Sequence, residues 1–263
     1  MNLRTALVTG SVAALMAFAA YGQETSVDTS ELDEIDPVVL GILKNAADYL
    51  TGAKVFSFRG ETAFDAVQDD GTKVEFGGSS LALIARPDRL RLETQKRDGT
   101  KRLMVFDGDN MWAYSKDHNV YATTAQPGDI DESLDFSIAV LRMKAPLADL
   151  VSPQLYETMT DGLVGAIYVD QAVVAGVTSH HLLISNDYVD VQFWVAEGDK
   201  PLIQRIVITY QEEEGQPQYR AHFLDWDMSP GNVDEELKFS PPEDAERIRF
   251  HIPASGTATE EAS

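Results

Sequence analysis

The sequence contains no cysteine. Disulfides and thiolate chemistry are therefore excluded, and a domain without them must be stabilised by a hydrophobic core of its own. Enzyme motifs are missing as well, because there is no Gly-x-Ser-x-Gly nucleophile motif and no phosphate-binding loop. Carboxylates are abundant, but no pattern selects an acid/base pair among them. We therefore expect that the chain is not an enzyme and uses no cofactor.

Histidine is scarce, with five in 263 residues, and the spacing does not suit a metal. His180 and His181 are adjacent, so in a strand they point to opposite faces and cannot both ligate one ion without a bulge. No His-x-His, His-x-x-x-His or glutamate-rich helix pattern appears. The sequence therefore predicts no metal site.

Positive charge is also in short supply. The chain has 21 Lys and Arg residues against 43 Asp and Glu residues, a formal net charge of −22. Such a chain is repelled by nucleic acid and by anionic membrane surfaces, so we expect no nucleic-acid partner. A local patch could still meet a bilayer or a basic partner, but the simplest interpretation is that acidity keeps the protein soluble.

Long hydrophobic runs are missing too. The apolar run at 7–20 has 14 residues, which is short of the ~20 that a membrane-spanning helix needs. It follows the positive charge of Arg4 and ends in small residues at Ala20 and Gly22. These features predict a secretory signal peptide at 1–22 that is cleaved near Gly22. We therefore expect an exported, soluble protein with no stable membrane insertion after cleavage.

The rest of the chain is predicted to comprise a flexible acidic leader at 23–35, a single domain at 36–252 and a disordered tail at 253–263. The domain begins with a helix, because Asp36 is a good N-cap and Pro37 suits the first helical position. Apolar residues follow at helical spacing before the chain turns to strands.

The stretch 85–121 reads as an antiparallel meander with one apolar side. Leu90 and Leu92 alternate with charged residues, which is the period-2 pattern of a half-buried strand. In the strand before it, the Gly77-Gly78 pair predicts a bulge or a sharp bend.

Residues 123–161 break the strand pattern. Asp131 or Ser133 can cap a helix that Pro146 ends or kinks, and residues 147–159 can form one or two further short turns. A helical insert between two β-rich halves is a natural lid or plug. About ten strands and two helical regions predict an α+β, mainly antiparallel fold, a twisted sheet that wraps a helix or a ligand.

Three segments of the first half carry a resemblance to a known family. They are 86–93 (RPDRLRLE), 105–114 (VFDGDNMWAY) and 119–121 (NVY), and they resemble the LolA family of bacterial periplasmic lipoprotein carriers. Residues 239–242 (FSPP) are similar to that family's closing segment.

The second half is more similar to the DUF2092 family of periplasmic proteins. The residues that carry this likeness lie at 173–182, 190–195 and 201–210. The chain therefore resembles DUF2092 proteins, within the lipoprotein-carrier (LolA/LolB-like) superfamily, over about 36–248.

The resemblance implies a periplasmic protein with an unclosed half-barrel, covered by an N-terminal helix and central lid helices, around an apolar cavity. In the carriers this cavity holds lipoprotein acyl chains, and an arginine just before the motif proline bonds to the lid and holds it shut. Arg86 stands at that position, although a surface arginine at a strand end would look the same. The chain departs from the carriers at Leu90 and Leu92, where they have aromatic residues.

The candidate ligand-binding residues are therefore Arg86, as the lid latch, and seven residues of a cavity wall: Leu90, Leu92, Val105, Trp112, Tyr114, Phe193 and Val195. On patterning alone, ordinary packing is the simpler explanation of the seven, because an apolar strand face is normally core.

Three functions stay open. The first is a periplasmic binding or carrier protein that holds a lipid, an acyl chain or another apolar ligand, with a lipid or an acylated protein as its partner. The second is a protein-interaction or envelope-stress-sensing module on the same scaffold, with an envelope protein as partner and no small ligand. A hydrolase with an unrecognised site is the third and weakest reading.

Overall fold

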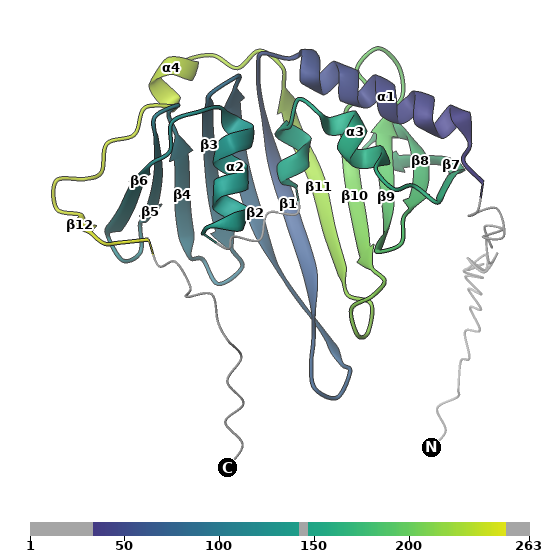
Figure 1. The fold of residues 1–263 in the computed structure, drawn as a ribbon, viewed down its shortest axis with the longest axis horizontal. Helices are drawn as coiled ribbons and strands as arrows, with labels where there is room; N and C mark the ends of the chain where they lie inside the picture. Colours follow the sequence, from purple (N-terminus) through teal and green to yellow (C-terminus); the bar gives the residue numbers. More distant parts are fainter. Residues whose placement is uncertain (1–33, 142–146, 251–263) are drawn as a thin grey trace, which may run out of the picture.

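The computed structural model describes residues 34–141 and 147–250, which form one sheet and the helices that cover it (Figure 1). The predicted signal peptide at 1–22, nearly all of the leader, Pro146 and the tail at 253–263 lie outside these ranges. Within them, none of the helices combines the length and the apolarity that a membrane span requires.

Twelve strands make up the sheet, in the order β12-β6-β5-β4-β3-β2-β1-β11-β10-β9-β8-β7. Their bounds are β1 Val55–Val67, β2 Lys73–Ala85, β3 Arg89–Lys96, β4 Lys101–Phe106, β5 Asn110–Ser115, β6 Val120–Ala125, β7 Gly165–Val174, β8 Val177–Ser185, β9 Val189–Ala196, β10 Ile203–Tyr210, β11 Gln218–Asp227 and β12 Glu246–Arg247. All pairs are antiparallel except β12 with β6. In this order β12 and β7 are the two edges, so the half-barrel is unclosed and the predicted fold class is confirmed. The two-residue β12 is too short to leave a pattern in the sequence.

The helices lie along one face and one rim of the sheet (Figure 1). They are α1 Pro37–Gly52, α2 Ile130–Ala139, the 3₁₀ turn η2 Ala148–Val151, α3 Leu155–Thr160 and α4 Val233–Glu236. The start of α1 is as predicted, because Asp36 accepts a hydrogen bond from the Val38 backbone at 2.8 Å and Pro37 is the first helical residue. The short turns η2 and α3 also occur where residues 147–159 predicted them.

We call the face of the sheet that packs against α1, η2 and α3 the inner face, and the opposite face the outer face. The main core lies between the inner face and these helices, and it includes the fully buried Leu43 of α1, Phe56 of β1 and Leu155 of α3. Side chains alternate between the two faces along each strand. The face of any residue therefore follows from the pairing register.

The cap of α2 differs from the prediction. Neither Asp131 nor Ser133 caps the helix, because Asp129 forms a reciprocal capping box with Glu132. The Asp129 carboxylate accepts from the Glu132 backbone at 3.0 Å, and the Glu132 carboxylate accepts from the Asp129 backbone at 3.1 Å. This arrangement satisfies two backbone donors, which a single cap cannot do.

The predicted bulge at Gly77-Gly78 is wrong. The register of β2 passes both glycines without a shift, against β1 on one side and β3 on the other. A Cβ on Gly77 would lie 2.1 Å from the Thr62 carbonyl oxygen, and one on Gly78 would lie 2.4 Å from that of Gln95. The glycines are therefore explained by close approach of neighbouring backbones.

Candidate functional site

The pairing register divides the seven predicted lining residues between the two faces. Leu90 pairs with Phe106 and belongs to the main core, as do Phe193 and Val195, while Leu92 packs against that core. Val105, Trp112 and Tyr114 lie on the outer face. The register shows this, because Val105 pairs with Arg91 and with Trp112.

The prediction that Val105, Trp112 and Tyr114 share one cavity with Leu90 is therefore wrong. The two aromatic residues pack instead against the closing segment of the chain. The ring of Phe239 lies 6.0 Å from that of Trp112 and 5.8 Å from that of Tyr114, between centroids. Large apolar side chains on this part of the outer face are explained by the C-terminal segment that covers them.

We call η2 and α3 the lid turns. An apolar cavity of about 260 Å³ lies between these turns and the inner face of β8, β9 and β10. Its aliphatic and aromatic lining comes from Leu147, Leu150, Leu155, Met159 and Leu163 on the lid side, and from Ile184, Val189, Val191, Phe193, Ile206 and Ile208 on the sheet. Of the predicted lining residues only Phe193 borders it. Val195 is fully buried in the core, and Leu90 and Leu92 belong to the other half of the sheet.

The sequence held a signal for this wall. Val189, Val191 and Phe193 alternate along one strand, and Ile206 and Ile208 do the same on the next. The register places Val191 beside Ile208 and Phe193 beside Ile206 on the inner face. Alternation predicts such a face, but it does not say whether a void lies against it.

A few polar groups also border the cavity, among them Asp149, Asn186 and Tyr210. Burial raises the pKa of the Asp149 carboxyl, and the negative charge of Asp135 raises it further. Burial also raises the pKa of the Tyr210 hydroxyl. Both shifts favour the neutral form, which suits an apolar surrounding.

Arg86 ties the sheet to the lid. It follows β2 directly, and its Nη1 donates a hydrogen bond to the carbonyl of Val151, the last residue of η2. The next residue, Pro87, accepts a backbone hydrogen bond from Ile130 at the start of α2, at 2.9 Å. The end of β2 is thus bonded to both α2 and η2.

The guanidinium of Arg86 is costly to bury. Its Nε and Nη2 are buried and have no hydrogen-bond partner among the described residues, and its centre lies 5.7 Å from the centroid of the Phe56 ring. Burial lowers the pKa of Arg86, while the nearby carboxylate of Asp131 acts in the opposite sense. Groups of this kind are held by their surroundings at a cost and are candidates for a functional role.

The two adjacent histidines point to opposite faces, as predicted, because His180 pairs with Val195 and His181 with Trp194. His181 stacks on the Trp194 ring with centroids 4.1 Å apart. No group of three or more His, Asp or Glu side chains in the described part of the chain is arranged to hold a metal ion. The absence of a metal site and of catalysis stays a prediction.

Comparison with known proteins gives one family and several distant folds. A family model described as "Predicted periplasmic protein (DUF2092)" matches residues 41–251. LprF from Mycobacterium bovis is 10% identical with a TM-score of 0.48, over 80% of this chain and 99% of that chain. The lipoprotein LppX from Mycobacterium tuberculosis is 14% identical with a TM-score of 0.44, over 76% of this chain and 100% of that chain.

A LolA superfamily protein from Nitrosomonas europaea is 10% identical with a TM-score of 0.34, over 76% of this chain and 97% of that chain. No curated protein matches the chain. With identities and TM-scores this low, we take no argument from these structures.

Proposed function

Because the chain belongs to the DUF2092 family of predicted periplasmic proteins, as its sequence predicted, we propose that it is a periplasmic binding or carrier protein for an apolar ligand. The ligand is a lipid or another molecule with an alkyl chain, and it lies beneath the lid. The observation that carries this proposal is the apolar cavity of about 260 Å³ between the lid turns and β8–β10. The lining rather than the volume supports a ligand site, because aliphatic and aromatic side chains form most of the wall on both the lid side and the sheet side.

The size and lining of the cavity favour part of one alkyl chain. Small-molecule sites usually measure about 300–1,000 Å³, so this cavity is at the small end. Each methylene group that leaves water contributes ~0.8 kcal/mol, and eight of them therefore contribute roughly 6 kcal/mol before the costs of binding. The polar groups of Asp149, Asn186 and Tyr210 mark where a headgroup could be accepted.

Arg86 is proposed as the latch of this site. Its bond to Val151 holds one end of η2, and η2 supplies Leu150 and Asp149 to the cavity wall. Loss of the bond would free the wall without removing any lining side chain. Arg86→Leu is therefore expected to speed ligand release while leaving the fold intact.

Native mass spectrometry of gently purified protein tests the proposal, together with displacement of a fluorescent fatty acid. Val191→Phe fills the cavity and is expected to abolish co-purified lipid and to weaken probe binding. Val177→Phe adds the same bulk at an exposed valine of the neighbouring strand β8 and serves as the matched control. Absence of lipid from the wild type, with equal probe binding in both variants, would overturn the proposal.

A second candidate function is protein interaction, and one observation favours it. A groove of about 430 Å³ on the outer face is lined by five basic residues and one acidic residue: Arg59, Arg91, Lys101, Arg102, Lys116 and Glu93. Arg59 and Arg91 are paired with carboxylates, so Lys101, Arg102 and Lys116 carry most of the positive charge of the groove. A basic groove on a chain of net charge −22 suits an acidic partner. A stable envelope partner that is lost from Arg102→Glu/Lys116→Glu, in protein that carries no lipid, would favour this function over the first.

A further inference from the structure

The β1–β2 hairpin extends beyond the lid helices (Figure 1), and its inner face carries exposed aromatic residues there. Phe64 and Phe76 pair across the two strands, with 44% and 51% of their surface exposed. Their rings stack with centroids 6.0 Å apart and planes 27° apart. Val74, two residues from Phe76 on the same face, is 40% exposed. Adjacent exposed apolar residues of this kind mark a contact site more often than single ones do.

These phenylalanines are the outer end of a row that reaches the cavity. Phe64 pairs with Tyr219 of β11, Tyr219 pairs with Ile208 of β10, and Ile208 pairs with Val191 of β9. Ile208 and Val191 line the cavity. Because neighbouring strands lie ~4.8 Å apart, the four steps from Phe76 to Val191 span roughly 19 Å. We call Phe76, Phe64 and Tyr219 the aromatic track.

The middle of the track is already desolvated. Tyr219 packs against the main core, and burial raises the pKa of its hydroxyl to about 12. Apolar and aromatic side chains thus follow one another along the inner face, from the cavity through the partly buried Tyr219 to the exposed rings at the hairpin.

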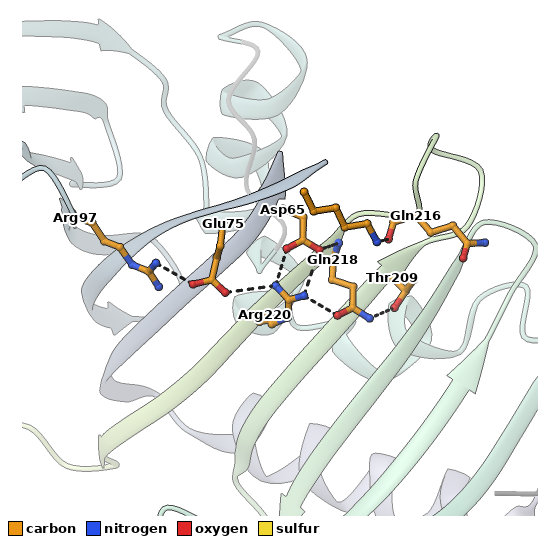
Figure 2. A network of polar contacts seen from close by, with 8 residues as sticks. Asp65, Glu75, Arg97, Thr209, Gln216, Gln218 and Arg220 are labelled. Carbon is orange, nitrogen blue, oxygen red and sulfur yellow. Dashed lines mark hydrogen bonds and ion pairs between the residues drawn. The ribbon is translucent and has the colours of Figure 1, made fainter. Parts of the chain in front are cut away.

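A polar network on the outer face fixes the hairpin that carries the track (Figure 2). The Asp65 carboxylate accepts from Arg220 at 2.9 and 3.2 Å and from the Gln218 backbone at 3.0 Å. Glu75 of β2 lies 2.8 Å from Arg97 and 3.7 Å from Arg220. These bonds join β1, β2 and β11 directly behind Phe64 and Phe76. The aromatic pair therefore stands on a rigid support, which lowers the cost of binding.

We propose that the aromatic track is the outer part of the ligand site and binds the distal portion of a long alkyl chain whose inner portion lies in the cavity. The inference rests on the proposed function and adds a specificity to it, namely selection for chain length. The cavity is too small for a long chain, and the track is the apolar surface that continues from its wall. A short chain would occupy the cavity alone.

Binding of octanoate and palmitate to the full mature chain tests the inference by titration calorimetry. We expect the wild type to bind palmitate at least about tenfold more tightly than octanoate, because each additional buried methylene contributes up to about fourfold. Phe64→Ser/Phe76→Ser is expected to remove most of this ratio while leaving octanoate affinity unchanged. Leu81→Ser is the matched control, since Leu81 lies on β2, is also 51% exposed and faces outward.

The outcomes separate this inference from the function beneath it. One outcome would overturn the track but keep the proposed function. In it, Val191→Phe weakens octanoate binding, while Phe64→Ser/Phe76→Ser leaves the ratio of palmitate to octanoate affinity unchanged. No binding of either fatty acid would overturn the proposed function. Loss of vesicle co-sedimentation in the double variant, with the ratio intact, would assign the rings to a membrane surface and overturn the track. Far-UV circular dichroism and Phe76→Ser alone control for misfolding.

Discussion

Replacing Arg86 by leucine separates the stability of the lid from the stability of the fold. The guanidinium donates to the Val151 carbonyl, while its Nε and Nη2 have no partners in the described part of the chain. A hydrogen bond from a charged donor contributes ~1.5–3 kcal/mol. Removing a half-buried charge with orphaned donors returns a similar amount. We therefore expect the free energy of unfolding to change by less than about 1 kcal/mol.

The lid should nevertheless open more often, because Val151 loses its only bond to the end of β2 that the structure describes. A loss of ~1.5–3 kcal/mol corresponds to a roughly 10- to 100-fold increase in local opening. Amide hydrogen exchange over residues 147–160, read by mass spectrometry, measures it. Arg89→Leu is the control, because Arg89 pairs with the exposed Asp234 at 2.6 Å and not with the lid. Equal lid exchange in wild type and Arg86→Leu, or equal acceleration in both variants, would refute the reasoning.

Four further substitutions test the electrostatics and the backbone packing. Because the pKa of Asp149 is raised in the folded protein, its ionisation destabilises the fold at pH values above the ordinary carboxyl pKa. Asp149→Asn should therefore raise the melting temperature at neutral pH, and the gain should shrink toward pH ~4. An equal gain at both pH values would contradict this. Arg220 lowers the pKa of Asp65, so that carboxylate stabilises the fold above its usual pKa and the effect is lost as pH falls through the lowered value. Asp65→Asn should therefore cost about 2 kcal/mol in urea unfolding at neutral pH and less below pH ~4, and a loss that is independent of pH would contradict the assignment. Gly77→Ala would bring a Cβ within 2.1 Å of a β1 carbonyl oxygen and should cost more than ~2 kcal/mol, whereas Gly41→Ala meets nothing within 4 Å in α1 and should gain ~0.5–1 kcal/mol; thermal melts of the pair check the contrast.

The elements were predictable where local chemistry decides them. Asp36 and Pro37 start α1 because the Asp36 carboxylate accepts a hydrogen bond from a backbone N–H of the first turn, and Pro37 has no N–H that would need an acceptor. The cap of α2 was not predicted correctly, since three acidic or hydroxyl residues compete there and only Asp129 has a glutamate three residues on. The glycine pair was misread because a bulge and a close backbone approach ask for the same residue.

The faces of the meander were harder to predict, because alternation fixes which residues share a face only within one strand. The face of Trp112 depends on how β5 pairs with β4, and Trp112 pairs with Val105 rather than with Phe106. The family resemblance suggested Trp112 and Tyr114 as cavity lining, whereas patterning alone favoured ordinary packing. The structure instead turns Trp112 and Tyr114 toward Phe239, more than a hundred residues later in the chain.

The cavity depends on the space between the sheet and the lid turns, and the sequence pattern of a single strand carries no information about that space. Val191 and Ile208 line a void, while Val195 on the same face of β9 is fully buried in packed core. Their side chains are chemically alike, and what differs is how completely the covering helices and turns fill the space above each. Arg86 was predictable only because its position next to a proline matched a family pattern, yet it is the group that joins the sheet to η2. The position of the lid turn decides whether the inner face is wall or core, and the Arg86–Val151 bond is therefore the contact through which a single substitution should change the site without changing its lining.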